Sequence, residues 1–181
     1  MASRMSKKNW LKMITLIVAI LALVGIALSC NSPSPSGNKA PDFTLPTMTG
    51  ANITLSELEG TPVVINFWSI SCQYCVGQLP YLENVAQQSE GEIKVIAIYL
   101  GGNASSVQEF FGDYEPTMIV ALDEAMEVFW SYSSIYNPRG YIPLTLFIDS
   151  AGIVKYAKIG AFSSEAALWD TLNDVFGITI P

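Results

Sequence analysis

The sequence contains no histidine among its 181 residues. This absence excludes Ser-His-Asp and Cys-His catalysis, His-containing zinc sites and His-ligated haem. Basic residues are also scarce: from residue 30 onward, five Lys and Arg stand against all 16 Asp and Glu. So acidic a domain cannot neutralise phosphates, and an anionic membrane surface would repel it. We therefore expect no nucleic-acid partner, and membrane contact through the N-terminus alone.

The first 29 residues have the features of a membrane-targeting segment. Residues 1–12 carry four basic residues and no acid, and residues 13–28 are 16 consecutive uncharged residues. A run of this length is shorter than the roughly 20 residues of a membrane-spanning helix and suits the apolar region of a secretory signal. Basic residues stay on the cytoplasmic side, so residues 1–29 are predicted to direct the rest of the chain out of the cytoplasm.

The apolar run ends in Ala27-Leu28-Ser29-Cys30, which resembles a bacterial lipobox. The resemblance implies that Cys30 is the site of lipid attachment, although Ala27 stands where such motifs usually have leucine. An uncleaved N-terminal anchor and a simple secreted protein are the alternatives. All three place the domain outside the cytoplasm, and the first two tether it to the cell membrane.

A tether and one folded domain are predicted after the targeting segment. Residues 31–39 contain only Asn, Ser, Pro, Gly and Lys, so they cannot bury apolar surface. Residues 30–39 are therefore predicted to be a flexible tether, and residues 40–181 the folded domain.

Strand-like and helix-like segments alternate along the domain. The expected strands are residues 52–55, 62–68, 93–100, 117–122, 144–149 and 153–159. The expected helices are residues 72–88, 104–114, 123–132 and 163–176. Ser56 and Glu59 have the spacing of a capping box, and Asp123 is expected to cap the third helix. The alternation predicts an α/β domain with helices on both faces of a central sheet.

Two cysteines form the motif Cys72-Gln73-Tyr74-Cys75, after a predicted strand and at the start of a predicted helix. Free backbone N–H groups at a helix N-terminus can lower a cysteine pKa from about 8.5 to about 3.5–7.5. Cys72 is expected at the exposed helix start and Cys75 one turn inside. We therefore predict that Cys72 is the nucleophile that forms a mixed disulfide and that Cys75 resolves it.

Two other interpretations of the cysteine pair are open at this point. The pair could be half of a zinc site, but no second pair and no histidine complete it, so no metal is expected. It could also be a permanent structural disulfide. A bridge that closes so short a loop would contribute little stability.

Four motifs together resemble TlpA/ResA-like proteins of the thioredoxin superfamily, which are related to AhpC/TSA-type redoxins. They are the A-P-D-F-x-L opening at residues 40–45, the glycine-bounded segment 50–60, Asn-Phe-Trp at 66–68 before the cysteines, and P-x-T-x-F at 143–147. The resemblance covers residues 40–177. It implies a thioredoxin-like three-layer sandwich with a central mixed sheet, helices on both faces and an N-terminal β-hairpin.

The resemblance also implies residue roles around the cysteines. Pro143 would be a cis-proline that faces the pair, and the backbone of Ile142 would bind the substrate chain. Apart from the resemblance, Trp68, Tyr74 and Ile70 are candidates for an apolar rim around Cys72 that binds a protein substrate, and a place in the core is the alternative for Trp68. Family members are commonly exported, tethered reductants that serve cytochrome c maturation or similar thiol repair.

The chain departs from the family pattern at three positions near the cysteines. Ser71 replaces a usual tryptophan, Gln78 replaces a frequent glutamate, and Asn66 stands where thioredoxin has a buried aspartate. Such carboxylates are thought to shuttle protons for the resolving cysteine. A neutral amide cannot accept that proton, so another group or water would have to take it.

The sequence therefore predicts an extracytoplasmic thiol–disulfide oxidoreductase that reduces protein disulfides by dithiol exchange. No cofactor is expected, and electrons would come from a membrane-bound donor. Two alternatives differ in class. A thiol peroxidase would use Ser69 and Arg139 beside the cysteine, and a non-catalytic lipoprotein binding module would keep the fold without rapid chemistry.

Overall fold

The computed structural model describes residues 37–178, and the predicted targeting segment, Cys30 and residues 31–36 of the tether lie outside this range. Within residues 37–178, no helix is long and apolar enough to cross a membrane. The strands are β1 Thr44–Pro46, β2 Asn52–Thr54, β3 Val63–Trp68, β4 Lys94–Leu100, β5 Ile119–Asp123, β6 Leu144–Ile148 and β7 Val154–Ile159. The helices are α2 Gln73–Gln88, α3 Ala104–Phe111, α4 Glu127–Tyr136 and α5 Glu165–Phe176, with a short 3-10 helix at Leu55–Leu58.

The central sheet is mixed, as the sequence predicted. Its strand order is β5-β4-β3-β6-β7. β3 and β5 pair parallel with β4, whereas β6 pairs antiparallel with both β3 and β7. β1 and β2 form the predicted N-terminal hairpin as a separate antiparallel sheet. β3 lies in the middle of the main sheet, so the loop that follows it is supported from both sides.

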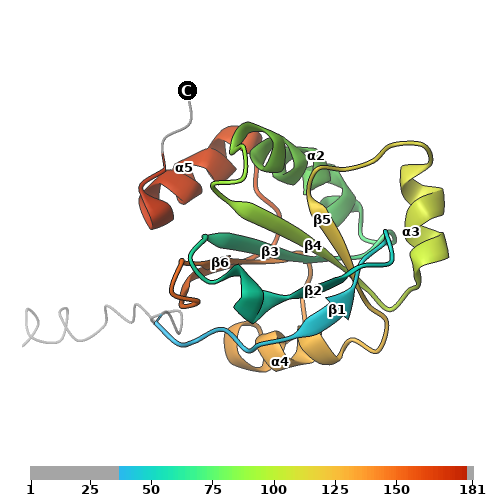
Figure 1. The fold of residues 1–181 in the computed structure, drawn as a ribbon, viewed down its shortest axis with the longest axis horizontal. Coiled ribbons are helices and arrows are strands. Elements are labelled where there is room, and N and C mark those ends of the chain that lie inside the picture. Colours follow the sequence, from blue (N-terminus) through green and yellow to red (C-terminus); the bar gives the residue numbers. More distant parts are fainter. Residues whose placement is uncertain (1–36, 179–181) are drawn as a thin grey trace, which may run out of the picture. The chain divides into compact units, whose positions relative to one another are not determined.

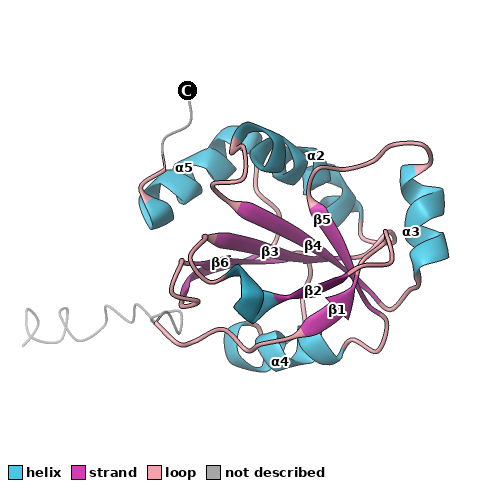
Figure 2. Ribbon diagram, in the orientation of Figure 1, coloured by secondary structure: helices cyan, strands magenta, loops and turns pink. Residues whose placement is uncertain are grey.

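Helices cover both faces of this sheet (Figures 1 and 2). One core cluster joins the sheet to α2, α3 and α5 through Leu82, Val107 and Leu168. The other joins the opposite face to α4 and the hairpin through Phe129 and Leu45. Both clusters are dense in buried Ile, Leu, Val and Phe, whose removal from water is the main stabilising contribution. The architecture is the predicted thioredoxin-like three-layer sandwich.

Several local predictions differ from the structure. Residues 37–39 were predicted as tether, but Gly37 N–H donates to the Val154 carbonyl and Val154 N–H donates to the Asn38 carbonyl, so the folded domain includes them. The capping box at Ser56 does not form, because Ser56 N–H donates instead to the Asp42 carboxylate.

The third predicted helix is shifted along the chain. It was expected at residues 123–132, whereas α4 spans Glu127–Tyr136. Asp123 ends β5 instead, but its carboxylate still accepts hydrogen bonds from the N–H groups of Val128 and Phe129 in the first turn of α4. The sequence therefore identified the capping side chain and misplaced the helix start.

Candidate active site

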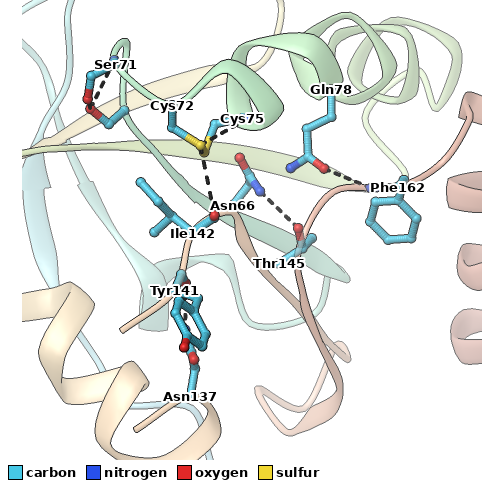
Figure 3. The surroundings of a disulfide bond; sticks show 11 residues. Asn66, Ser71, Cys72, Cys75, Gln78, Asn137, Tyr141, Ile142, Thr145 and Phe162 are labelled. Carbon is cyan, nitrogen blue, oxygen red and sulfur yellow. Dashed lines mark hydrogen bonds between the residues drawn. A yellow bond between two sulfur atoms is a disulfide. The ribbon is translucent and has the colours of Figure 1, made fainter. Parts of the chain in front are cut away.

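A disulfide joins Cys72 and Cys75 at the start of α2 (Figure 3). Cys72 is the N-cap residue of the helix and is partly exposed, whereas Cys75 is fully buried one turn inside. The two Cα atoms lie 5.2 Å apart. The arrangement offers one sulfur to solvent and keeps the other in the core.

Cys72 lies between the first turn of α2 and the loop before β6. The backbone N–H of Cys75 donates to Cys72 Sγ over 3.2 Å, as expected for a sulfur at a helix N-terminus. On the other side, Cys72 Sγ lies 3.9 Å from the carbonyl oxygen of Ile142. The peptide bond between Ile142 and Pro143 is cis, in agreement with the predicted geometry. The free N–H groups of the first helical turn favour negative charge on Cys72.

The loop that carries Ile142 is held by a buried asparagine. Asn137 is 1% exposed, and its Nδ2 donates to the carbonyl oxygen of Tyr141 over 2.6 Å. The Asn137 carbonyl in turn accepts a hydrogen bond from the Ser133 hydroxyl of α4. These two bonds fix the backbone next to Ile142, and therefore the carbonyl that contacts Cys72.

Replacing Asn137 with alanine should slow thiol exchange. The loop loses its anchor to α4, and a displacement of about 1 Å at a reacting centre can cost a large factor in rate, so we expect a decrease of about tenfold. The measurement is the rate of disulfide reduction by the purified protein. Asn103→Ala removes the side-chain cap of α3 and is a matched control for stability loss. An equal rate loss in both variants would show that Asn137 has no specific role.

The predicted rim residues have different positions. Tyr74 is 77% exposed beside the cysteines, and Ile142 is partly exposed opposite them. The rim interpretation of Trp68 is wrong and its core alternative holds: the side chain is fully buried and packs against Tyr99 and Phe110. As the last residue of β3, Trp68 points toward the core beneath α2 and α3, because the neighbouring helices cover this end of the strand.

The two amides that replace family carboxylates are both buried next to the disulfide (Figure 3). Asn66 Nδ2 donates to Thr145 Oγ1 over 2.9 Å, and Gln78 Oε1 accepts from the N–H of Phe162 over 3.2 Å. Neither Thr145 nor Phe162 was assigned a role from the sequence. Thr145 belongs to the P-x-T-x-F motif, but it reaches Asn66 only through the pairing of β3 with β6. Phe162 reaches Gln78 through the loop after β7, so motif spacing predicts neither contact.

Comparison with known proteins agrees with this geometry. Residues 35–174 match the Redoxin family. The chain is 29% identical to the thiol-disulfide oxidoreductase ResA of Oceanobacillus iheyensis over 168 residues, which are 90% of this chain and 84% of that protein. It is also 29% identical to ResA of Bacillus subtilis over 138 residues, covering 76% and 74% of the two chains.

Among solved structures, a putative thiol:disulfide interchange protein DsbE from Chlorobium tepidum superposes with a TM-score of 0.68 and 25% identity. The superposition covers 77% of this chain and 96% of that one. The fold and the disulfide at the helix start define a thioredoxin-like thiol–disulfide oxidoreductase. The chain belongs to the Redoxin family, and its ResA relatives carry the same class of activity in their names.

Proposed function

We propose that the protein reduces disulfides of other proteins outside the cytoplasm, with Cys72 as nucleophile and Cys75 as resolving cysteine. The observation that carries the proposal is the unequal placement of the two sulfurs. Cys72 is accessible and receives a backbone N–H at the helix start, whereas Cys75 is fully buried. Only Cys72 can meet a bulky partner.

The exchange follows from this placement. Cys72 thiolate attacks one sulfur of the substrate disulfide, and the second substrate sulfur leaves as a thiol after protonation. Cys75 then attacks Cys72 in the mixed disulfide. The Cys72–Cys75 disulfide forms, the first substrate sulfur is released, and two electrons have passed to the substrate. The disulfide seen in the structure is the product state of this cycle.

Uncharged side chains surround Cys72 and suit an apolar or aromatic stretch of substrate. Tyr74, in the first turn of α2, is 77% exposed, and Tyr141, in the loop before β6, is 55% exposed. Ile70, in the loop before α2, and Ile142, next to Tyr141, are partly exposed. Exposed aromatic side chains contribute large contact area at low entropic cost. The backbone of Ile142 is available to align an extended substrate chain.

Replacing Tyr74 and Tyr141 together with alanine should weaken protein substrates selectively. We expect kcat/KM for a disulfide-bonded protein to fall about tenfold, because about 1.4 kcal/mol of aromatic contact is lost. The rate with glutathione disulfide should stay unchanged, since this small molecule does not need the rim. Ile135→Ala, an exposed position on α4, is the matched control. Equal losses with both substrates would contradict a role of the tyrosines in substrate binding.

We further propose that Cys30 carries a lipid that tethers the domain, and that a membrane-bound donor reduces Cys75 and Cys72 after each cycle. The proposal rests on the basic and apolar residues before Cys30 and on the absence of a cofactor motif in the sequence. In cells, Cys30→Ser should move the protein from the membrane fraction to the soluble fraction. Continued membrane association of this variant would favour an uncleaved anchor.

The peroxidase alternative receives no support from the geometry of the site. Ser69 Oγ is hydrogen-bonded to Ser71 Oγ over 3.0 Å, and Arg139 is exposed in the loop after α4. A thiol peroxidase needs both groups directed at the peroxide beside its cysteine. Disulfide exchange needs neither.

A further inference from the structure

Two buried amide side chains lie next to the disulfide, and each has one polar atom without a hydrogen-bond partner among the described residues. These atoms are Oδ1 of Asn66, an acceptor, and Nε2 of Gln78, a donor. Asn66 is 0% exposed and Gln78 is 1% exposed. Buried polar atoms are nearly always paired. Trp68 Nε1 and the Tyr136 hydroxyl are the other exceptions among the described residues, and the two amides stand out because both lie next to the disulfide.

Both amides lie on the side of Cys75. Asn66 alternates along β3 with Val64 and Trp68, which belong to the same core cluster as Cys75, so its side chain points to that face of the sheet. Gln78 follows Cys75 by three residues in α2 and therefore lies on the same side of the helix. Figure 3 shows the Asn66 oxygen directed toward the disulfide and the Gln78 nitrogen directed to the same region.

Reduction of the disulfide supplies what the Asn66 oxygen lacks, because it gives Cys75 a proton. We propose that Asn66 and Gln78 are positioning residues for Cys75. In the reduced protein, Asn66 Oδ1 accepts a hydrogen bond from the Cys75 thiol, and Gln78 Nε2 donates to the same sulfur as it becomes the attacking thiolate. This inference rests on the proposed function, since it assigns roles within the resolving step.

Among residues 37–178, the core cluster that contains Cys75 offers no base to take its proton. Neutral amides have no basic site. The buried carboxylates of the described residues are Glu83 and Asp123, and both are hydrogen-bonded to backbone N–H groups of other elements. On the neighbouring strand β7, the ammonium group of Lys158 lies 5.2 Å from the centre of the Phe162 ring, and a cation cannot accept a further proton.

The remaining titratable groups packed in the same cluster are Cys72, Tyr81 and Tyr99. A phenol O–H is a hydrogen-bond donor and a poor base. During the resolving step, Cys72 is bonded to the substrate in a mixed disulfide. It is therefore not a thiolate and cannot accept the proton of Cys75. The cluster therefore contains no internal proton acceptor.

The proton of Cys75 must then pass to the departing substrate sulfur or to solvent. Cys75 sulfur forms a bond to Cys72 sulfur, and the bond between Cys72 and the substrate sulfur breaks. The substrate sulfur leaves with the electron pair of that bond and takes up the proton that Cys75 loses, directly or through solvent. The products are a Cys72–Cys75 disulfide and a substrate thiol, so atoms and electrons balance without any carboxylate.

The resolving step can be measured directly with dithiobis(nitrobenzoate) and the reduced full-length protein in detergent, carrying Cys30→Ser so that Cys72 and Cys75 are its two thiols. Attack by Cys72 releases one coloured thiolate, and attack by Cys75 on the mixed disulfide releases the second. In the unmodified protein, the second phase should depend on pH through the Cys75 thiol alone. Release of only one equivalent would mean that Cys75 does not resolve, and the proposed function itself would fail.

Carboxylate variants test the inference separately. Asn66→Asp and Gln78→Glu keep the side-chain shape and place a base beside Cys75. General-base assistance should accelerate the second phase at least about tenfold near neutral pH and add an inflection to its pH profile. Gln88→Glu, exposed at the far end of α2, adds the same charge and should match the unmodified protein. Two released equivalents with unaltered profiles in both variants would overturn the inference alone.

An equilibrium measurement gives an independent readout. Asn66→Leu removes the acceptor that only the reduced state can pair. The equilibrium with glutathione should therefore shift about fivefold toward the Cys72–Cys75 disulfide, as expected for the loss of one hydrogen bond from the reduced state. An unchanged equilibrium constant in this variant would also overturn the role of Asn66.

Discussion

The Cys75→Ser variant should accumulate a stable mixed disulfide with its substrate and lose turnover by at least about 1,000-fold. Cys72 remains accessible at the start of α2 and can still attack, but no second sulfur is left to release the substrate. The covalent complex should be visible on a non-reducing gel and disappear on treatment with dithiothreitol. The assay excludes other thiols, because they would replace the resolving cysteine.

The reciprocal variant is the matched control. Cys72→Ser leaves Cys75, which is 0% exposed and cannot reach a protein disulfide. It should form no covalent complex and show no turnover. A complex formed equally well by both variants would mean that the two sulfurs are equivalent, and the assignment of nucleophile and resolving cysteine would be wrong.

The Glu83→Gln variant should lose about 2–3 kcal/mol of stability, which corresponds to a decrease of about 5–10 °C in Tm. Glu83 is buried on α2, and its two oxygens accept hydrogen bonds from the backbone N–H groups of Thr117 and Met118 and from the Tyr114 hydroxyl. A glutamine would place an N–H₂ group against one of these donors. Thermal unfolding followed by circular dichroism measures the effect.

The same glutamate gives the stability a predicted pH dependence. Burial raises the pKa of Glu83, but the hydrogen bonds from Met118, Thr117 and Tyr114 together lower it by more. The pKa of Glu83 therefore lies below its ordinary value. A carboxylate with a lowered folded-state pKa stabilises the fold above its unfolded-state pKa, and this stabilisation is lost as the pH falls through the folded-state pKa.

Glu83→Gln should therefore be most destabilising near neutral pH and converge toward the unmodified protein in acid. Glu124→Gln, at an exposed position after β5, is the matched control and should change stability little at any pH. A parallel loss at all pH values would show that shape, rather than the charge of Glu83, accounts for the effect.

Much of the fold could be predicted because local patterns agree with the tertiary arrangement. The runs at 62–68 and 93–100 are apolar on both faces, which suits strands buried between two helical layers, and the structure places β3 and β4 there. The start of α4 was missed because Met126 enters the helix in a left-handed conformation, and nothing in the local sequence marks this turn.

The candidate site was predictable to a smaller extent. The cysteine pair could be placed from its position between strand and helix, and the structure has it at the start of α2. Trp68 was a candidate for the substrate rim because it is aromatic and close to Cys72, with a core position as the alternative. Its orientation depends on the alternation of β3 and on packing by α3, which lies more than 30 residues away in the chain. The spacing of residues within a short motif does not predict contacts between residues so far apart in the chain.

A reducing dithiol is the predicted form of the site, and the reduction potential of the Cys72/Cys75 couple tests this most directly. The full-length protein would be equilibrated with defined ratios of dithiothreitol and its oxidised form, and free thiols would be trapped and counted by mass. A potential at or below that of thioredoxin, about −270 mV, is the predicted result. A potential near about −120 mV would identify a disulfide-inserting oxidant and contradict the proposed role as a reductant.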